Sequence, residues 1–478
     1  MKKLQFMAWP KLCTAVLLGT AALFMASCAR DGFDNDEKFE SSVRNAQLTP
    51  PVASKIDVKD SPDGSELVVT WPVVMGAGGY EVKQYDITSA GKEVLVKTAN
   101  IDGCSANMPR EEDTKYRFEI RTLGNSALNN TSSTTSSKKE HSTIIDATDY
   151  IAPGDLAAYF TPDKLSSEVG DTLCYDLEPG GIYTMSANID LGGHWVTFRS
   201  KDKNTNAILN LTSKTTFITY GGIILKYMDI NASINEDGHA LITLSSKPEG
   251  CKKTAQNDYC IIPNPIGIQQ CNIKNLPCRI LNDKVEGDPK YAIEVLRIQN
   301  SIIQLNQSST SSGQFILLNK SIPINFVIQN STIYNSSAAT NYYFAQIHGQ
   351  EPAKLGTYSK AVFKFFNNTF YNLAKEQQFI NTNTFKGKAS VTFNWENNIF
   401  VNCGRKQIWD KLTNASASKN VLTAKNNTYW FDGADANEKY DTAVLKTDPG
   451  FADPANGDFT ISGAEQVAKG TGDPRWIK

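Results

Sequence analysis

The sequence predicts an all-β protein in which a small N-terminal β-sandwich is followed by a right-handed parallel β-helix. Short alternating segments of apolar and polar residues fill residues 49–146. A motif then recurs about every 30 residues through the rest of the chain. The 478 residues are 40% hydrophobic and 10% aromatic, which is enough apolar material for a large core, so global disorder is excluded.

The charge and the histidine content exclude several classes of protein. The formal net charge is −2, which excludes a strongly basic chain that binds nucleic acid through its total charge. Only four histidines are present, and no Cys/His spacing indicates zinc. We therefore expect no cofactor, no metal ion and no nucleic-acid partner.

The N-terminus has the pattern of a secretion signal. Lys2 and Lys3 precede an apolar segment that is too short for a permanent membrane helix and that ends in Met25-Ala26-Ser27-Cys28. This ending resembles a bacterial lipobox, in which the cysteine is acylated and becomes the first residue of the mature protein. The resemblance implies a signal peptide over residues 1–27, lipidation of Cys28, a tether over 28–48 and a lipid-anchored, surface-exposed location at the outer membrane. An ordinary cleaved signal peptide with an incidental cysteine is the alternative.

Residues 49–146 are expected to form the β-sandwich. Alternating segments at 67–71, 80–85, 93–96 and 115–121 are separated by turn residues. The Pro50-Pro51 start, Trp71 in an early strand and the pattern Tyr116-x-Phe118-x-Ile120 resemble a fibronectin type III module. Such modules are usually spacers, so we assign no chemistry to this one.

Residues 147–478 are expected to form the β-helix. In each repeat, apolar residues alternate on both sides of one anchor residue, usually Asn, at which the phase of the alternation slips. The anchors are Tyr227, Gln270, Asn300, Asn330, Asn367, Asn397 and Asn426. Alternation with period two indicates strands, and Asn tolerates left-handed backbone better than other non-glycine residues. The pattern predicts one strand–bend–strand unit per coil, with Asn side chains that stack in a ladder rather than bind a ligand.

A third strand precedes each of these units. The segments that predict it are 279–282, 315–319, 344–348, 379–382 and 408–410. Longer spacings between anchors place extra loops at about 233–263 and 335–358. Cys251 and Cys260 lie in the first of these loops and could form a disulfide.

Two further segments carry a family resemblance. Residues 177–183 read Leu-Glu-Pro-Gly-Gly-Ile-Tyr, and residues 448–459 begin Asp-Pro-Gly-Phe. They resemble the first coil and the terminal segment of pectate-lyase-like β-helices. The whole chain resembles Bacteroidetes surface lipoproteins that combine a fibronectin type III-like module with such a β-helix and are encoded in polysaccharide-utilisation loci. The resemblance implies a polysaccharide ligand, with outer-membrane glycan transporter components as further partners.

Carboxylates are scarce where a catalytic site would be expected. Polygalacturonan hydrolysis needs neighbouring Asp or Glu side chains, and calcium-dependent elimination needs clustered carboxylates with a cation to take the proton. Between residues 295 and 409 the acids are Glu351, Glu376 and Glu396 only, and Asp283, Glu286 and Asp288 are expected in a solvated loop. We therefore predict no catalytic residue. Enzymatic activity stays open, because the fold alone decides nothing; the alternative function is a pectate-lyase-like polysaccharide lyase or a glycoside hydrolase acting on pectin.

The same window holds ten basic residues. Lysines follow the predicted third strand of successive coils at Lys284, Lys320, Lys354, Lys386 and Lys411. Coils rise about 4.8 Å, so these side chains are expected to form a cationic column along one edge, with Tyr342, Tyr343, Arg405, Lys406 and Trp409 beside it.

Rings that stack on sugar faces beside cations that meet carboxylates suit an acidic glycan. The favoured function is a non-catalytic cell-surface glycan-binding lipoprotein for an acidic polysaccharide such as pectin or homogalacturonan. Three alternatives stay open: lysines that only solubilise a β surface, core packing of Trp409, and an adhesion or structural protein.

Overall fold

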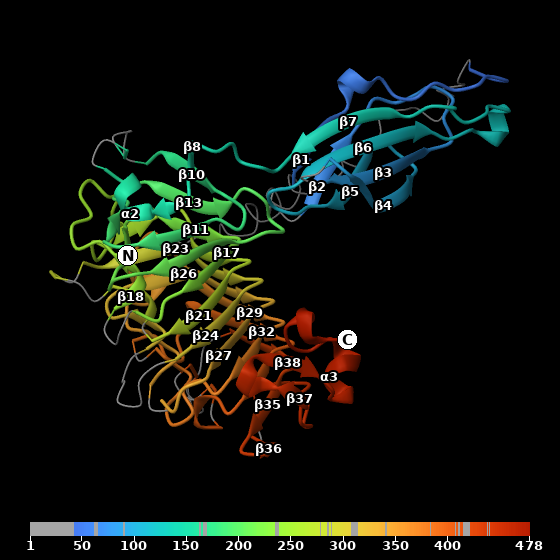
Figure 1. Ribbon diagram of the computed structural model, residues 1–478. Helices are drawn as coiled ribbons and strands as arrows, with labels where there is room; N and C mark the ends of the chain where they lie inside the picture. The colour runs from blue at the N-terminus through green and yellow to red at the C-terminus, as the bar shows by residue number, and fades with distance from the viewer. Residues whose placement is uncertain are drawn as a thin grey trace, which may run out of the picture. The chain divides into compact units, whose positions relative to one another are not determined.

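The computed structural model describes residues 43–478 apart from 62–65, 89–90, 162–163, 166–169, 235–238, 278, 284–285, 288, 307–313, 340–341, 383, 407, 410–411, 414–420, 437 and 439. The predicted signal peptide (1–27), Cys28 and most of the predicted tether lie outside these residues. Within the described ranges, no helix is long and apolar enough to cross a membrane. Contacts divide the chain into two compact units, with the division between Ile144 and Ile145, and each unit is treated by itself (Figure 1).

The first unit is a sandwich of two antiparallel sheets. One sheet has the order β1 (Asp57–Asp60), β2 (Glu66–Thr70), β5 (Ser105–Pro109), and the other has β4 (Glu93–Ile101), β3 (Tyr80–Ile87), β6 (Lys115–Thr122), β7 (Ser137–Ser142). Short 3-10 helices η1 (Ala53–Lys55) and η2 (Ser126–Leu128) flank the strands. Alternate residues point inward, so that Leu67 and Val69 of β2 share a core with Tyr116 and Phe118 of β6. Trp71 belongs to this core and packs edge-on against Tyr80, with ring centroids 5.4 Å apart.

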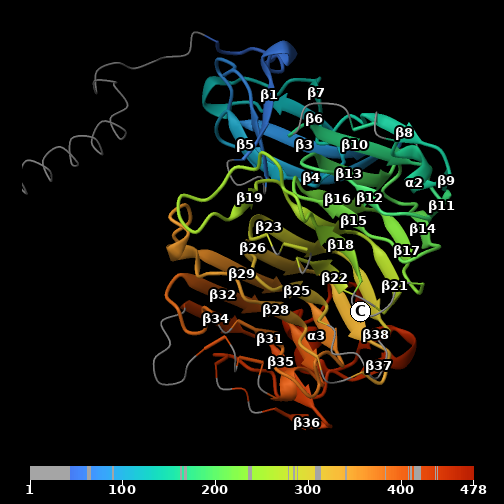
Figure 2. The same ribbon diagram turned by 90° about the vertical axis from the view of Figure 1, so that its left-hand side faces the viewer.

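The second unit is a stack of coils whose strands form three long sheets (Figure 2). We name these the pre-bend, post-bend and third sheets, by the position of their strands around each coil. The pre-bend sheet runs β8 (Asp149–Ile151), β10 (Thr172–Leu177), β13 (Trp195–Ser200), β16 (Ile223–Lys226), β20 (Ile266–Gln269), β23 (Tyr291–Gln299), β26 (Ile322–Gln329), β29 (Ala361–Phe366), β32 (Val391–Glu396) and β34 (Val421–Lys425), with β19 (Cys260–Ile262) also pairing with β23.

The other two sheets follow the same stacking. The post-bend sheet runs β9 (Gly154–Asp155), β11 (Ile182–Met185), β14 (Ala207–Leu211), β17 (Met228–Asn231), β21 (Asn272–Leu276), β24 (Ile302–Leu305), β27 (Thr332–Asn335), β30 (Thr369–Tyr371), β33 (Ile399–Val401), β35 (Thr428–Phe431) and β36 (Ala434–Asp435). The third sheet runs β12 (Ile189–Asp190), β15 (Phe217–Thr219), β18 (Ala240–Leu244), β22 (Arg279–Asn282), β25 (Ile316–Leu318), β28 (Ala345–Ile347) and β31 (Ile380–Asn381). Neighbouring coils pair in parallel in all three sheets, and among the described strands of these sheets only the β35–β36 pair is antiparallel. The predicted fold class, a β-helix after a small β region, is confirmed.

The predicted bends lie at the anchor residues. The backbone is left-handed at all seven anchors, with φ between 49° and 56°. In three neighbouring pairs, at 300/330, 330/367 and 397/426, the Nδ2 group of one Asn donates to Oδ1 of the Asn in the preceding coil at 3.1–3.2 Å. The prediction of an Asn ladder at the bend is therefore confirmed.

A second, buried polar column lies one residue after each bend from Gln270 onward. Its members are Cys271, Ser301, Ser331, Asn368, Asn398 and Asn427, all shielded from solvent. From Cys271 onward, each backbone N–H donates to the side chain of the next member at 2.9–3.2 Å. The column satisfies amides that the sharp bend would otherwise leave unpaired in the core.

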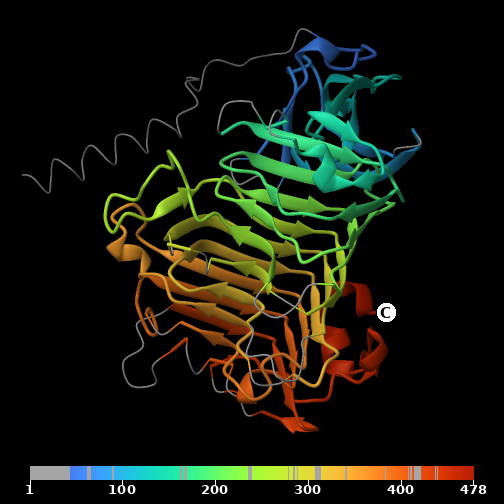
Figure 3. The same ribbon diagram turned by 60° about the vertical axis from the view of Figure 1, so that its left-hand side comes forward.

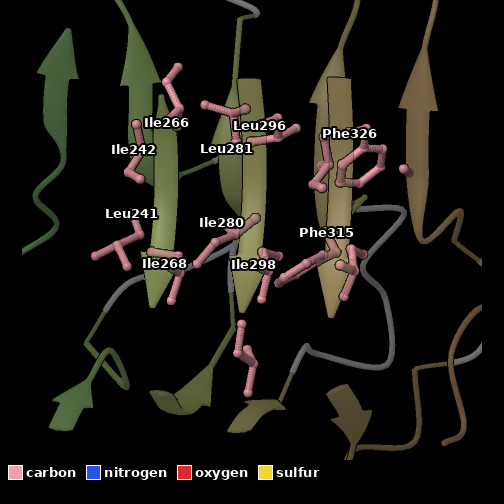
Figure 4. Close-up of a cluster of buried hydrophobic side chains, with 14 of the residues drawn as sticks. Leu241, Ile242, Ile266, Ile268, Ile280, Leu281, Leu296, Ile298, Phe315 and Phe326 are labelled. Carbon is pink, nitrogen blue, oxygen red and sulfur yellow. The ribbon is translucent and has the colours of Figure 1, made fainter. Parts of the chain in front are cut away.

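Apolar side chains stack along the inside of the coils (Figure 4). Ile266, Leu296 and Phe326 occupy the same register in three successive strands of the pre-bend sheet. Full burial of each such side chain contributes roughly 1.5–3 kcal/mol. The predicted third strand at 408–410 is wrong in its described part, because Ile408 and Trp409 lie in a turn, and the third sheet ends at β31.

The two predicted extra loops meet and form one lobe on the coils, which we call the insertion lobe (Figure 3). Cys251 and Cys260 form the expected disulfide. Backbone N–H of Gln256 donates to Leu355 O at 2.9 Å, and Asn257 Nδ2 donates to Lys354 O at 2.7 Å. The lobe therefore joins residues 250–262 to residues 350–358, which include η3 (Pro352–Lys354).

The C-terminal segment folds back over the outer face of the post-bend sheet (Figure 3). It contains β37 (Phe451–Asp453), η5 (Pro454–Asn456), β38 (Asp458–Ile461), α3 (Ala464–Lys469) and η6 (Pro474–Trp476). Ile461 packs against Ile399 and Val401 of β33, which point away from the main core. At the opposite end of the stack, the short helix α2 (Leu156–Tyr159) places Leu156 in the main core.

Candidate functional site

The predicted cationic column is only partly assembled. Lys320 is exposed two residues after β25, and Lys386 is half-buried in the turn after β31. Lys354 instead belongs to η3 in the insertion lobe, where its Nζ lies 3.4 Å from Glu351 Oε1. Lys284 and Lys411 lie outside the described residues. Lys320 and Lys386 follow β25 and β31, which are separated in the third sheet by β28, and neither lysine lies within a strand.

Two of the predicted sugar-stacking rings belong to the core, which corrects that prediction. Trp409 is 1% exposed; its ring centroid lies 4.4 Å from that of Trp395, and its Nε1 donates to the Tyr429 hydroxyl at 3.4 Å. Tyr342 is also 1% exposed and belongs to the main core. Neither ring can lie against a polysaccharide on the surface. Tyr343 is half-buried.

The remaining two predicted residues lie in η4 (Gly404–Lys406). Arg405 is exposed, with a left-handed backbone at φ 54°. The side chain of Lys406 lies outside the described part of the chain. Arg405 is therefore an accessible cation, but it forms no cluster with the described lysines.

A set of polar and cationic side chains lies instead on the outer face of the pre-bend sheet. Strand register places Gly267, Arg297, Val327, Lys364, Asn394 and Thr423 in one column. It places Gln269, Gln299, Gln329, Phe366, Glu396 and Lys425 in the next column. We call these two columns the ladder face.

Contacts on the ladder face fix several of its side chains. Gln269 Nε2 donates to Gln299 Oε1 at 2.8 Å, and Arg297 Nη2 donates to Gln269 Oε1 at 3.3 Å. A Cβ atom at Gly267 would lie 3.0 Å from Cγ of Arg297, so the glycine gives the arginine room to lie along the sheet. Lys364 is exposed and forms no ion pair with any described residue. The face thus combines oriented amides, a half-buried aromatic ring at Phe366 and three cations. Two of these cations, Arg297 and Lys364, lie two coils apart, about 10 Å along the stack.

The three acids of the central window do not come together. Glu351 lies in the insertion lobe beside Lys354, and Glu376 is exposed after β30. Glu396 lies on the ladder face, where its register neighbours are Phe366 and Lys425. Paired carboxylates, which glycoside hydrolysis uses, are therefore not formed by these three residues.

Asp283, expected in a solvated loop, is instead buried. Its carboxylate accepts the backbone N–H groups of Asn319, Lys320 and Ser321, which connect β25 to β26. Burial raises the pKa of this carboxyl despite those donors. Asp283 thus holds the chain turn that carries Lys320.

In the part of the chain that the structure describes, no metal centre is indicated, and two of the buried cysteines are poor nucleophiles. Within the described ranges, no group of three or more His, Cys, Asp or Glu side chains is placed to hold a metal ion. Burial raises the pKa of Cys271 and of Cys403 to about 12, so both thiols stay protonated at neutral pH.

Three family models match successive parts of the chain, and each is described as a domain of unknown function. They are DUF4992 at residues 5–178, DUF4957 at residues 181–336 and DUF5123 at residues 363–476. No curated protein matches the sequence.

Two solved structures are similar to parts of the chain. The pectate lyase PelI of Erwinia chrysanthemi, in complex with tetragalacturonic acid, is 10% identical over 83% of this chain and 88% of its own, with a TM-score of 0.15. The pectate lyase Pel3 of Pectobacterium carotovorum is 11% identical over 68% of this chain and 85% of its own, also with a TM-score of 0.15. At these TM-scores the comparison carries no argument, so the architecture rests on the strand pairing described above.

Proposed function

We propose that this protein is a non-catalytic glycan-binding lipoprotein whose ligand is an anionic polysaccharide of the pectin class. The observation that carries the proposal is the ladder face, where Arg297 and Lys364 share one strand register and oriented glutamine amides line the next. A linear polyanion lying along the stack would meet cations and amides at a regular spacing. Glu396 is the one carboxylate of the two columns, and a single carboxylate does not supply the acid and base that hydrolysis needs.

Two lysines that precede strands of the pre-bend sheet would add cations to this surface. Lys320 and Lys386 follow strands of the third sheet, and Asp283 holds the turn before Lys320 in place. Exposed ion pairs contribute at most about 1 kcal/mol each, so binding would be the sum of many weak contacts. Such binding weakens as salt increases, because the Debye length at physiological ionic strength is about 8 Å.

We further propose that Cys28 carries a lipid anchor at the outer membrane and that the first unit acts as a spacer. The lipobox-like run before Cys28 supports the anchor. Pairing of a three-stranded with a four-stranded antiparallel sheet supports a fibronectin type III-like module. This arrangement would hold the β-helix away from the membrane and available to polysaccharide and to glycan transporter components.

The ladder face is tested by reversing one charge on it and one elsewhere. Lys364→Glu should weaken binding to de-esterified polygalacturonate by about fivefold to tenfold, because an attraction becomes a repulsion. Lys274→Glu is the matched control, since Lys274 is an exposed lysine on the post-bend sheet. Equal effects of the two variants, or binding to neutral glucans as strong as to polygalacturonate, would contradict the proposed site.

A further inference from the structure

A polar cleft lies beside the bends at Gln270, Asn300 and Asn330, where the C-terminal segment meets the coils. It has a volume of about 410 Å³, within the range of about 300–1,000 Å³ that small-molecule pockets occupy. Its lining includes Lys203, Asn206, Gln270, Asn272, Asn300 and Arg475. We call this hollow the bend cleft.

The C-terminal segment supplies a fixed wall of the bend cleft. The Arg475 guanidinium donates to the backbone oxygens of Asn300 and Asn330 at 3.2 Å each and of Ser301 at 2.9 Å. It also donates to the fully buried carboxylate of Asp473, which accepts the Thr332 hydroxyl at 2.7 Å. Arg475 therefore joins the C-terminal segment to the bends, and Asp473 balances its charge.

Two amides of the cleft are oriented by one carboxylate. Asp229 Oδ1 accepts Nδ2 of Asn206 at 2.7 Å and Nδ2 of Asn272 at 2.8 Å. One N–H of each NH₂ group is held by Asp229, so each amide has a fixed direction and offers its Oδ1 acceptor together with its second N–H. These two acceptors come from different coils. Asn206 immediately precedes β14 and Asn272 lies in β21, and these strands pair with the two edges of β17, which carries Asp229.

Donors complete the cleft. The Asn ladder uses Asn300 Oδ1, which accepts Asn330 Nδ2 at 3.1 Å, and leaves Asn300 Nδ2 without a partner among the described residues. Gln270 is exposed at the bend that precedes Asn300 and supplies both an amide donor and an amide acceptor. Charges in and beneath the cleft balance, with Lys203 and Arg475 against Asp229 and Asp473.

We infer that the bend cleft binds a neutral, hydroxyl-rich sugar ring, as a subsite separate from the anionic ladder face. Sugar hydroxyls both donate and accept, which matches a cleft whose amides present oriented Oδ1 acceptors at Asn206 and Asn272 together with open N–H donors. A charge-balanced lining gives a carboxylate no advantage there. This inference goes beyond the proposed function, because it assigns the site to an uncharged chain end or side branch.

The test measures monosaccharide binding to the full chain by saturation-transfer NMR. Galactose, glucose, arabinose and rhamnose are compared with galacturonate, which differs from galactose in carrying a carboxylate. At least one neutral sugar should bind, with an affinity that does not change between 50 and 500 mM NaCl, because no net charge is involved. Asn272→Ala should weaken that affinity about fivefold, the loss expected for one hydrogen bond.

Two variants keep the test independent of folding. Gln270→Asn shortens the exposed amide and introduces the residue type found at five other bends. The variant should therefore fold and still weaken binding. Asn210→Ala is the matched control, because Asn210 lies on the outer side of β14 away from the cleft lining. Absence of binding by every neutral sugar, stronger binding of galacturonate than of galactose, or an equal loss in Asn210→Ala would overturn the inference. The ladder face is judged separately, by polygalacturonate binding in Lys364→Glu.

Discussion

Replacement of Asn398 by Ala should destabilise the β-helix more than replacement of its neighbour Asn397. Asn398 is fully buried, and its side chain takes part in four hydrogen bonds. Oδ1 accepts the N–H of Asn368 at 3.1 Å and its Nδ2 at 2.8 Å, and Nδ2 donates to Phe365 O at 2.8 Å and Asn427 Oδ1 at 2.9 Å. At about 1 kcal/mol for each bond, Asn398→Ala should lower the free energy of unfolding by about 3–5 kcal/mol.

Asn397 gives a matched comparison one residue away. It is half-buried at the bend and accepts one bond, from Asn426 Nδ2 at 3.2 Å. Its φ of 56° costs Ala about 1 kcal/mol more than Asn, so Asn397→Ala should cost about 1–2 kcal/mol in total. Asn398→Ser should recover about half of the loss, since Ser331 occupies the same column and its Oγ accepts the Ser301 N–H at 3.2 Å.

The assay is urea unfolding of the full-length protein, followed by tryptophan fluorescence and by far-UV circular dichroism. Trp395 and Trp409 are buried in the affected coils and report on them, whereas Trp71 belongs to the other unit. Equal destabilisation by Asn397→Ala and Asn398→Ala, or a loss below about 1 kcal/mol in Asn398→Ala, would refute the structural role of the buried column.

Other outcomes follow from the same structure. Cys28→Ala should release the protein from membrane fractions, and a variant that still sediments with membranes would contradict the anchor. Replacing Lys320 and Lys386 together by Ala should weaken polygalacturonate binding cumulatively, with neither single replacement costing more than about 1 kcal/mol; a decisive single lysine would argue for a pocket instead of a surface. Cys251→Ser should lower stability by about 2–3 kcal/mol, as expected for a disulfide that closes a short loop, and should expose the insertion lobe to proteolysis; unchanged cleavage would mean that contacts with residues 350–358 hold it alone.

The bends could be predicted from sequence because their physical requirement selects a residue type. A left-handed backbone favours Asn, and an alternation that slips at Asn300 or Asn330 marks the place directly. The buried column beside it was not predicted, although a small polar residue recurs at each position. Its members differ in type, as in Ser301 and Asn398, and only the structure shows that each of these side chains accepts the backbone N–H of the column member in the preceding coil.

The candidate site was harder to predict than the fold. Alternation assigns inward and outward sides within strands, but Trp409 lies in a turn, where spacing gives no direction. Lys354 belongs to the predicted coil, but it lies in the insertion lobe and not at the edge of a strand. The ladder face depends on register across 30-residue and 37-residue repeats, as between Arg297, Val327 and Lys364. No local pattern marks Arg475 and Asn300 as neighbours, because they are 175 residues apart.

The central claim is that the β-helix binds an anionic polysaccharide without cleaving it, and one titration tests both halves. Purified protein is mixed with de-esterified polygalacturonate, methyl-esterified pectin and a neutral glucan, with and without calcium, and bound polymer and new chain ends are measured on the same samples. The proposal predicts salt-sensitive binding to polygalacturonate, weaker binding to the other two, and no unsaturated or reducing ends above a boiled control. Release of new ends would contradict the non-catalytic assignment, and salt-insensitive binding would contradict the electrostatic one.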